Sequence, residues 1–307
     1  MIDSPHDCLI IGGGPAGLTA AIYLARYHLN VMVIDEGCSR AATIPLSRNH
    51  AGFPDGVSGV ELLDRMRIQA RKYGAQFADG RVVAVTSNSD GFDIRTNGYD
   101  VTRARTVVLA TGVVNRRPAM PAETHDDAVA RGLIRYCPIC DAYEITDQRV
   151  AVIGTGDRGF NEAVFLRSFT TDVTLIAPEV EHRLTVQQAV RLEEFGIQIV
   201  NGPAECCRLL DDGISIKTSR GDEAFSAVYP ALGSDVHSEL AALLGAERTG
   251  EGCIVVDQHQ RTSVRRLYAA GDVVSGLDQM SHAMGQAGVA ATAIRNDLSD
   301  RAALLRS

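Results

Sequence analysis

Two glycine-rich turns, each between an apolar strand and a helix, restrict the fold of this chain more than any other feature. The first turn, Gly12–Gly17 (GGGPAG), follows the apolar run Cys8–Ile11 and precedes apolar residues at helical spacing to about His28. The second turn, Gly154–Gly159 (GTGDRG), follows the apolar run Arg149–Ile153 in the same way. Strand–turn–helix units of this kind build parallel sheets covered by helices. The pattern therefore predicts an α/β protein with two Rossmann-like, three-layer dinucleotide-binding domains.

Composition and charge exclude several classes of protein. The 307 residues suffice for about two domains, and 45% hydrophobic with 22% charged residues is an ordinary globular composition. The net charge of −8 is spread along the chain, and no apolar run reaches the ~18 residues of a spanning helix. Seven cysteines in a chain of this size, which starts with MIDSPHDC rather than a signal peptide, argue against a secreted disulfide framework. We expect a cytoplasmic protein without nucleic-acid or membrane partners.

The first glycine turn carries residues that suit a dinucleotide. Gly12 permits the tight turn, Gly14 lets the backbone approach a pyrophosphate, and Gly17 lets the helix pack closely on the strand. The N-terminus of the following helix offers free N–H groups to the phosphates. Asp35 ends the second apolar strand, Val31–Ile34, where a carboxylate accepts the hydroxyls of a ribose. Together these features predict dinucleotide binding.

A CxxC pair, Cys137 and Cys140, lies between the two turns. Such a pair is either half of a metal site or a redox dithiol. A zinc site needs two more ligands at matching spacing, and the sequence has no second CxxC or paired histidines, so we predict a redox dithiol and no metal site. Pro138 suits the first turn of a helix, whose dipole would lower the pKa of the thiol. Asp141, next to the second sulfur, is a candidate proton donor and acceptor.

Five motifs in a fixed order resemble those of a known family. GGGPAG, ATG at 110–112, CPICD, the second glycine turn and AAGDV at 269–273 resemble the low-molecular-weight thioredoxin reductases, which are FAD flavoproteins. The resemblance extends from about Asp7 to Asn296. It implies a discontinuous FAD domain, residues 1–116 and 245–307, and an inserted pyridine-nucleotide domain, residues 117–244, that carries the CxxC. It also implies a homodimer.

The resemblance further implies roles for individual residues. The residues implied to bind FAD are Gly12, Gly14, Pro15, Ala16, Asp35, Glu36, Arg40, Asn49, Val83, Ala110, Thr111, Gly112, Gly271, Asp272, Gln279, Met280 and Ser281. A helix that begins near Gln279 would point its N-terminus at the flavin, where its dipole would stabilise the negative charge of the reduced ring. The resemblance places Cys140 against the flavin and makes Cys137 the thiol that attacks a thioredoxin-like or other disulfide substrate.

The sequence departs from the family where NADPH should bind. The family has a basic His-Arg-Arg cluster after the second strand of its NADPH unit, and this chain has Ala177, Pro178 and Glu179 there. A carboxylate repels the 2′-phosphate that such a cluster neutralises. Arg158 occupies the second glycine turn where small residues are usual, and residues 278–281 lack the family's Arg-Gln pair. NADPH is therefore disfavoured. The remaining donors are NADH, held by Glu179, and a protein that delivers electrons directly, which we slightly favour.

These observations predict an FAD-dependent disulfide oxidoreductase that passes electrons through Cys137 and Cys140 to a thioredoxin-like disulfide, with weak or no use of NADPH. Two alternatives remain. A flavin-dependent dithiol oxidase would run the same parts in reverse, but members of that group tend to have His where Asp141 stands. A redox sensor would react once without turnover, so sustained turnover of a disulfide substrate distinguishes it from an enzyme.

Overall fold

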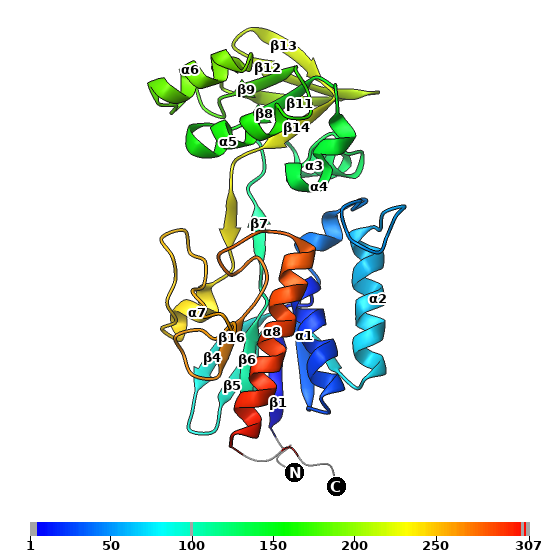
Figure 1. The fold of residues 1–307 in the computed structure, drawn as a ribbon, viewed down its shortest axis with the longest axis vertical. Helices are drawn as coiled ribbons and strands as arrows, with labels where there is room; N and C mark the ends of the chain where they lie inside the picture. The colour runs from blue at the N-terminus through cyan, green and yellow to red at the C-terminus, as the bar shows by residue number, and fades with distance from the viewer. Residues whose placement is uncertain (1–4, 99–100, 302–303, 305–307) are drawn as a thin grey trace. The chain divides into compact units, whose positions relative to one another are not determined.

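The computed structural model describes residues 5–98, 101–301 and 304, apart from the side chains of 205–207. It divides into two compact units (Figure 1). The first unit consists of Met1–Ala42, Gly59–Val114 and Val236–Ser307, and the second of Thr43–Ser58 and Asn115–Asp235. The predicted fold class is confirmed, because each unit contains a parallel sheet whose first strand leads through a glycine turn into a helix.

The first unit is built on a mixed sheet in the order β3-β2-β1-β6-β5-β4, with β16 paired to β6. Its strands are β1 (His6–Ile11), β2 (Val31–Asp35), β3 (Gln76–Asp79), β4 (Val82–Ser87), β5 (Phe92–Thr96), β6 (Val101–Leu109) and β16 (Leu267–Ala269). Ile11 lies opposite both Ile34 and Leu109 in the parallel ladders. The carboxyl ends of the three central strands therefore meet at one edge of the sheet.

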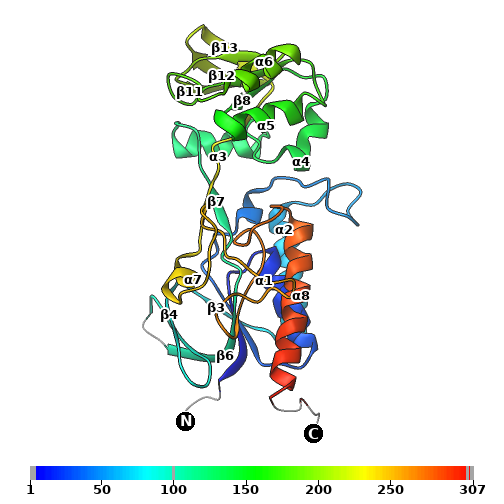
Figure 2. The same cartoon turned by 60° about the vertical axis from the view of Figure 1, so that its left-hand side comes forward.

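Three helices pack together in the first unit, namely α1 (Pro15–Arg26), α2 (Gly59–Lys72) and α8 (Met280–Ser299). Both views show α1 beside α8, and α1 also contacts α2 (Figures 1 and 2). Most of α1 is buried, because it lies between the sheet and its neighbouring helices and has small residues such as Ala20 and Ala21 there. A short helix, η1 (Arg40–Thr43), lies between β2 and α2.

The second unit repeats the parallel plan on a smaller scale. Its parallel sheet has the order β10-β9-β8-β14 and its antiparallel sheet the order β11-β12-β13. The strands are β8 (Val150–Ile153), β9 (Val173–Ile176), β10 (Gln198–Val200), β11 (Glu205–Leu210), β12 (Gly213–Thr218), β13 (Gly221–Phe225) and β14 (Ala227–Pro230). Ile153 lies opposite Ile176 and Pro230, so these strands also end at a common edge.

Local capping residues account for the ends of helices in the second unit. The helices are α3 (Ala122–Ala130), α4 (Pro138–Asp141), η2 (Ala142–Ile145), α5 (Gly156–Leu166) and α6 (Val186–Glu194). Thr185 caps α6 by a reciprocal pair of hydrogen bonds with Gln188, and Gly196 follows the helix with a positive φ of 70°. The helix α5 begins inside the glycine turn, at Gly156.

Two segments lie in a different unit from the one that the expected boundaries imply. Residues 236–244 belong to the first unit, because α7 (Glu239–Leu243) buries Ala241 in that unit's core. Thr43–Ser58 belongs to the second unit, where Arg48 pairs with Glu144. The chain passes between the units along the paired strands β7 (Val113–Asn115) and β15 (Ser234–Val236). No helix among the described residues is long and apolar enough to cross a membrane.

Candidate active site

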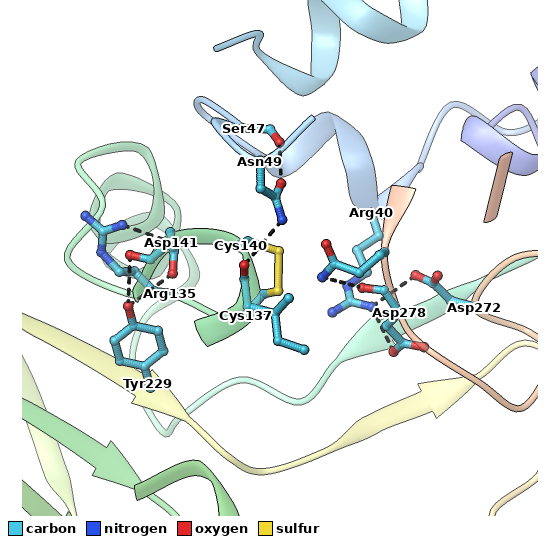
Figure 3. The surroundings of a disulfide bond; sticks show 12 residues. Arg40, Ser47, Asn49, Arg135, Cys137, Cys140, Asp141, Tyr229, Asp272 and Asp278 are labelled. Atoms are coloured by element: carbon cyan, nitrogen blue, oxygen red, sulfur yellow. Dashed lines mark hydrogen bonds and ion pairs between the residues drawn. A yellow bond between two sulfur atoms is a disulfide. The ribbon is translucent and has the colours of Figure 1, made fainter. Parts of the chain in front are cut away.

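A disulfide joins Cys137 and Cys140, with their Cα atoms 5.2 Å apart (Figure 3). Cys137 is the N-cap of α4, Pro138 occupies the first helical position, and the Cys140 N–H donates a 2.9 Å hydrogen bond to the Cys137 carbonyl. The sequence prediction that the pair opens a helix is confirmed. The spacing works because one turn of helix brings residues i and i+3 to the same side.

Asp141, which follows Cys140 in α4, lies between two polar side chains (Figure 3). Its Oδ1 accepts a 3.0 Å hydrogen bond from the Tyr229 hydroxyl, and its Oδ2 lies 3.2 Å from Nη1 of Arg135. Burial raises the pKa of Asp141, while Arg135 and the Tyr229 hydroxyl lower it in part. Burial also raises the pKa of Tyr229 above its usual range, so its hydroxyl stays a donor. Sequence analysis identified Asp141 but missed both partners, because neither has a diagnostic spacing from the CxxC.

A second acid, Glu162 on α5, interacts with Asp141. Burial and then the negative charge of Asp141 raise the pKa of Glu162 to about 7. Helix α5 packs against α4, which accounts for this proximity. The second unit therefore holds two interacting acids of raised pKa, one of which directly follows Cys140, and sequence analysis did not single out Glu162.

Asn49, expected to bind FAD, lies in the segment that packs in the second unit. Its Nδ2 donates a 3.3 Å hydrogen bond to the Ile139 carbonyl in the CxxC turn, and its Oδ1 accepts one from Ser47 (Figure 3). This side chain supports the backbone between the two cysteines. Its role toward FAD stays a prediction.

In the first unit the glycine turn leaves room beside Gly14. A methyl group on Gly17 would lie 1.9 Å from the Gly12 carbonyl oxygen, so helix and strand pack backbone to backbone. By contrast, among the described residues a methyl group on Gly14 would meet only the Ser39 hydroxyl, at 3.1 Å. Pro15 begins α1 immediately afterwards, and no acidic residue occupies its first turn. The positive end of the helix is thus free of a competing negative charge.

Asp35 is held at this turn by two groups that sequence analysis missed. Its Oδ1 accepts a 3.0 Å hydrogen bond from the Gly13 N–H, and its Oδ2 lies 3.0 Å from Nη2 of Arg67. The neighbouring Glu36 lies 3.8 Å from Arg81 in a largely exposed pair. Val83 lies on the outer strand β4 with 45% of its surface exposed.

The segment from Ala110 to Gly112 is fixed by His237. The Thr111 hydroxyl donates a 2.6 Å hydrogen bond to the His237 carbonyl, and the His237 N–H donates one to the Gly112 carbonyl. Gly112 has a φ of 63°, and no described atom lies within 4 Å of where its Cβ would be. Ala110 is buried at the end of β6, next to Gly12.

Gly271 and Asp272 follow β16 at the same sheet. The buried side chain of Gln286, on α8, accepts a 2.8 Å hydrogen bond from the Gly271 N–H. Nη1 of Arg40 lies 3.0 Å from Asp272 and 3.1 Å from Asp278 (Figure 3). Burial and the negative charge of Asp278 raise the pKa of Asp272, and Arg40 lowers it in part. The structure therefore brings together Arg40 and Asp272, which are far apart in sequence.

The predicted second helix end is also in place. Gln279 is the N-cap of α8, and Met280 and Ser281 form its first turn. The amide of Gln279 donates a 3.1 Å hydrogen bond to the Asp278 carbonyl. No acidic residue occupies the first turn, as at α1.

In the second unit the glycine turn is crossed by Arg158. A methyl group on Gly159 would lie 2.6 Å from the Gly154 carbonyl carbon, so this turn packs as closely as its counterpart. The Arg158 guanidinium extends from α5 to Gly233, where Nη1 lies 2.3 Å from the position of a Cβ. Gly233 follows β14 at the carboxyl edge of the parallel sheet, which is where dinucleotides bind in such folds.

The loop after β9 is folded back onto the same turn. The Arg183 N–H donates a 2.5 Å hydrogen bond to the Thr155 hydroxyl, and the Arg183 guanidinium pairs with Glu179 at 2.7 Å. The Nε2–H of His182 donates a 2.9 Å hydrogen bond to the Val200 carbonyl, and burial lowers the pKa of this histidine. The loop thus carries two glutamates, Glu179 and Glu181, of which Glu179 pairs with Arg183, and burial disfavours the charged form of its histidine.

Comparisons with known proteins agree with this geometry. A family model described as pyridine nucleotide-disulphide oxidoreductase matches residues 6–287. The chain belongs to this family. The thioredoxin reductase of Aquifex aeolicus strain VF5 is 33% identical over 285 residues, which are 89% of this chain and 86% of that protein. That of Streptomyces coelicolor is 31% identical over 88% of this chain and 86% of the relative. The crystal structure of thioredoxin reductase from Streptococcus pyogenes MGAS5005 superposes with a TM-score of 0.89 at 28% identity, covering 97% of this chain and 99% of that chain.

The chain is therefore a flavin disulfide oxidoreductase of the thioredoxin reductase type. The first unit fits FAD on its own structure, because no described atom lies within 4 Å of a Cβ at Gly112, only the Ser39 hydroxyl lies within 4 Å of one at Gly14, and the first turn of α1 carries no acid. The second unit fits a pyridine nucleotide less well, since Arg158 occupies the edge at Gly233.

We predict that Glu162→Gln, compared with the wild type, changes the free energy of unfolding in the stabilising direction more at pH 8 than at pH 5. A carboxyl whose folded pKa is about 7 holds a proton that the unfolded chain releases, so its contribution to the free energy of unfolding falls between about pH 4 and 7. Thermal unfolding followed by circular dichroism at several pH values measures this. Glu193→Gln, at an exposed site on α6, is the matched control. An equal effect of Glu162→Gln at both pH values would contradict the raised pKa.

Proposed function

We propose that this flavoprotein reduces thioredoxin-like protein disulfides through Cys137 and Cys140, with weak or no use of NADPH. The observation that carries the proposal is the disulfide at the start of α4 with Asp141 beside it. Relatives that match most of the chain are named thioredoxin reductase, which supports the substrate class. The electron donor is proposed from the structure of the second unit.

In the proposed FAD site, the cofactor supplies a two-electron carrier for the disulfide. Gly12, Gly14 and the first turn of α1 would face its pyrophosphate, where N–H groups and the helix dipole stabilise negative charge. Asp35, already oriented by Gly13 and Arg67, would accept hydroxyls of the adenosine ribose. Most of the remaining predicted contacts lie in two segments that follow strands, 110–112 and 271–272, and at the start of α8; Glu36, Arg40, Asn49 and Val83 lie outside these groups.

We expect the protein to purify yellow with one FAD per chain, and Gly14→Val to lose the cofactor. The valine side chain would fill the open space beside Gly14 while meeting few protein atoms, so the unit should fold without FAD. The flavin absorbance per chain and the circular dichroism spectrum measure both properties. Gly285→Ala, at an open position in α8, is the control that should stay yellow. A folded wild-type protein that cannot take up FAD would refute the assignment.

Once the dithiol is reduced, the protein's part in disulfide exchange with a partner is carried out by its own side chains. The Cys137 thiolate attacks one sulfur of the partner disulfide, which forms a mixed disulfide and releases one partner thiolate. The Cys140 thiolate then attacks Cys137 Sγ, which restores the internal disulfide and releases the second thiolate. Two electrons and two protons pass to the partner, and Asp141 is the proposed proton carrier for Cys140. For a two-electron couple each 30 mV of mismatch in potential costs about 1.4 kcal/mol.

Replacing Cys137 or Cys140 by Ser should abolish disulfide turnover and leave FAD bound. Thiol titration before and after flavin reduction should show a gain of two thiols per chain in the wild type and no gain in either variant. Cys38→Ser and Cys253→Ser are controls that should behave like the wild type, since both residues are free thiols. A single equivalent of product without further turnover would support a sensor and overturn the reductase.

The second unit supports a donor other than NADPH. A 2′-phosphate needs cations, and the loop after β9 carries Glu179, Glu181 and one arginine, Arg183, which is already paired with Glu179. Losing two charged hydrogen bonds weakens binding about 100-fold or more. Arg158 also covers Gly233, where any pyridine nucleotide would approach the sheet edge. The acidic loop disfavours NADPH, and the position of Arg158 favours direct electron delivery by a protein over delivery by NADH.

In an anaerobic titration we expect neither NADPH nor NADH to bleach the flavin efficiently, whereas a chemical reductant should. Arg158→Ser should increase bleaching by NADH, because the guanidinium no longer covers Gly233. Bleaching of the wild type by NADH alone would instead select the NADH alternative, and Glu179→Ala would then abolish it while Glu181→Ala would not. Rapid, saturable bleaching by micromolar NADPH would overturn the proposed donor preference.

A further inference from the structure

Two side chains from separate elements converge on the carboxylate that follows the redox cysteines. Arg135 lies in the segment before α4, and Tyr229 lies on β14. Each contacts a different oxygen of Asp141, with the Tyr229 hydroxyl on Oδ1 and the Arg135 guanidinium on Oδ2 (Figure 3). The two contacts thereby restrict the rotation of the carboxylate about the side-chain bonds of Asp141.

These contacts are poorly explained by stability alone. The side chains of Arg135 and Asp141 are only 18% and 24% exposed, so both charges lose most of their hydration. An ion pair of this kind adds little net stability, because the cost of desolvation offsets the attraction. In addition, Nε of Arg135 is buried without a hydrogen-bond partner among the described residues. A role in orienting Asp141 accounts for the arrangement.

We propose that Arg135 and Tyr229 are positioning residues that fix the Asp141 carboxylate and set its affinity for the proton of Cys140. The inference rests on the dithiol exchange proposed above. In that exchange the Cys140 thiol gives its proton to the Asp141 carboxylate as Cys140 Sγ attacks Cys137 Sγ of the mixed disulfide. The S–S bond to the substrate breaks, the substrate sulfur takes the electron pair, and Asp141 returns its proton to solvent or to the released thiolate.

The other charged groups that face Asp141 act in the opposite sense. Glu144 in η2 raises the pKa of Asp141, although Arg48 lies 3.7 Å from that glutamate. Glu162 on α5 also interacts with Asp141, whose negative charge raises the pKa of Glu162. Arg135 and the Tyr229 hydroxyl are thus the groups that favour the charged carboxylate against burial and the negative charge of Glu144.

The test follows the two phases of dithiol oxidation in the FAD-loaded protein. The protein is reduced with a phosphine, freed of reductant and mixed with the aromatic disulfide 5,5′-dithiobis(2-nitrobenzoate) between about pH 5.5 and 9. Release of the first coloured thiolate reports the attack on the reagent, and release of the second reports the attack by Cys140. This assay needs neither thioredoxin nor an electron donor. A failure of the proposed partner or donor therefore leaves it interpretable.

We expect the acid limb of the second phase to move to higher pH when either positioning residue is replaced. Tyr229→Phe should move it by about one pH unit and Arg135→Gln by about one to three, because each variant removes a group that favours the charged carboxylate. Arg135→Lys should recover part of the shift, and Asp141→Asn should remove the limb. The first phase should keep its pH dependence in the Arg135 and Tyr229 variants.

Two pairs elsewhere in the chain provide matched controls. Tyr268→Phe removes the hydroxyl of another buried tyrosine, which bonds Asp297 in the first unit. Arg149→Gln removes an arginine that pairs with Glu223 in the second unit. Both should leave the second phase unchanged. The proposal would be overturned if the second-phase pH profile of Tyr229→Phe coincides with that of the wild type and Arg135→Gln is either unfolded or unshifted as well. A shift confined to the first phase would overturn it as well.

Discussion

Each unit depends on one close approach between two stretches of backbone. Gly17 is seated against the Gly12 carbonyl and Gly159 against Gly154, at distances that no side chain tolerates. These contacts fix the start of α1 and of α5 directly beyond the first strand of each sheet. Because the parallel registers bring neighbouring strands to an end at the same edge, the segments that follow those strands gather around the two helix starts.

The same backbone plan carries different charges in the two units. At the first glycine turn, the opening turn of helix α1 contains no acidic residue. The nearby carboxylate of Asp35 already accepts a hydrogen bond from the Gly13 N–H and pairs with Arg67. At the second turn, Asp157 and Arg158 occupy the start of α5, and Gln188 bonds Asp157 at 2.6 Å. Polar side chains of the protein therefore occupy positions that a cofactor would contact. Two domains of the same fold thus need not bind the same ligand, because the ligand depends on the side chains at the carboxyl edge of the sheet.

Sequence analysis could predict what depends on local pattern. The strands and helices around both glycine turns, the disulfide in α4 and the start of α8 follow from periodicity, glycine placement and helix-terminus chemistry, which involve residues close in sequence. It could not predict the contacts that orient the site. The hydrogen bonds between Gln286 and Gly271 and between His237 and Thr111 depend on how elements distant in sequence pack together. No residue spacing in the sequence predicts them.

In the proposed exchange, the reactivity of the disulfide depends on a balance at Asp141 that only tertiary structure can set. Burial raises the pKa of this acid, and a protonated acid cannot accept the proton of a thiol. Arg135 and the Tyr229 hydroxyl act in the opposite direction, because each stabilises the charged carboxylate. A carboxylate whose pKa is lowered too far would be too weak a base to compete for that proton. The proposed role therefore needs both influences on the same group, so that Asp141 would accept the proton of Cys140 and release it again within one exchange.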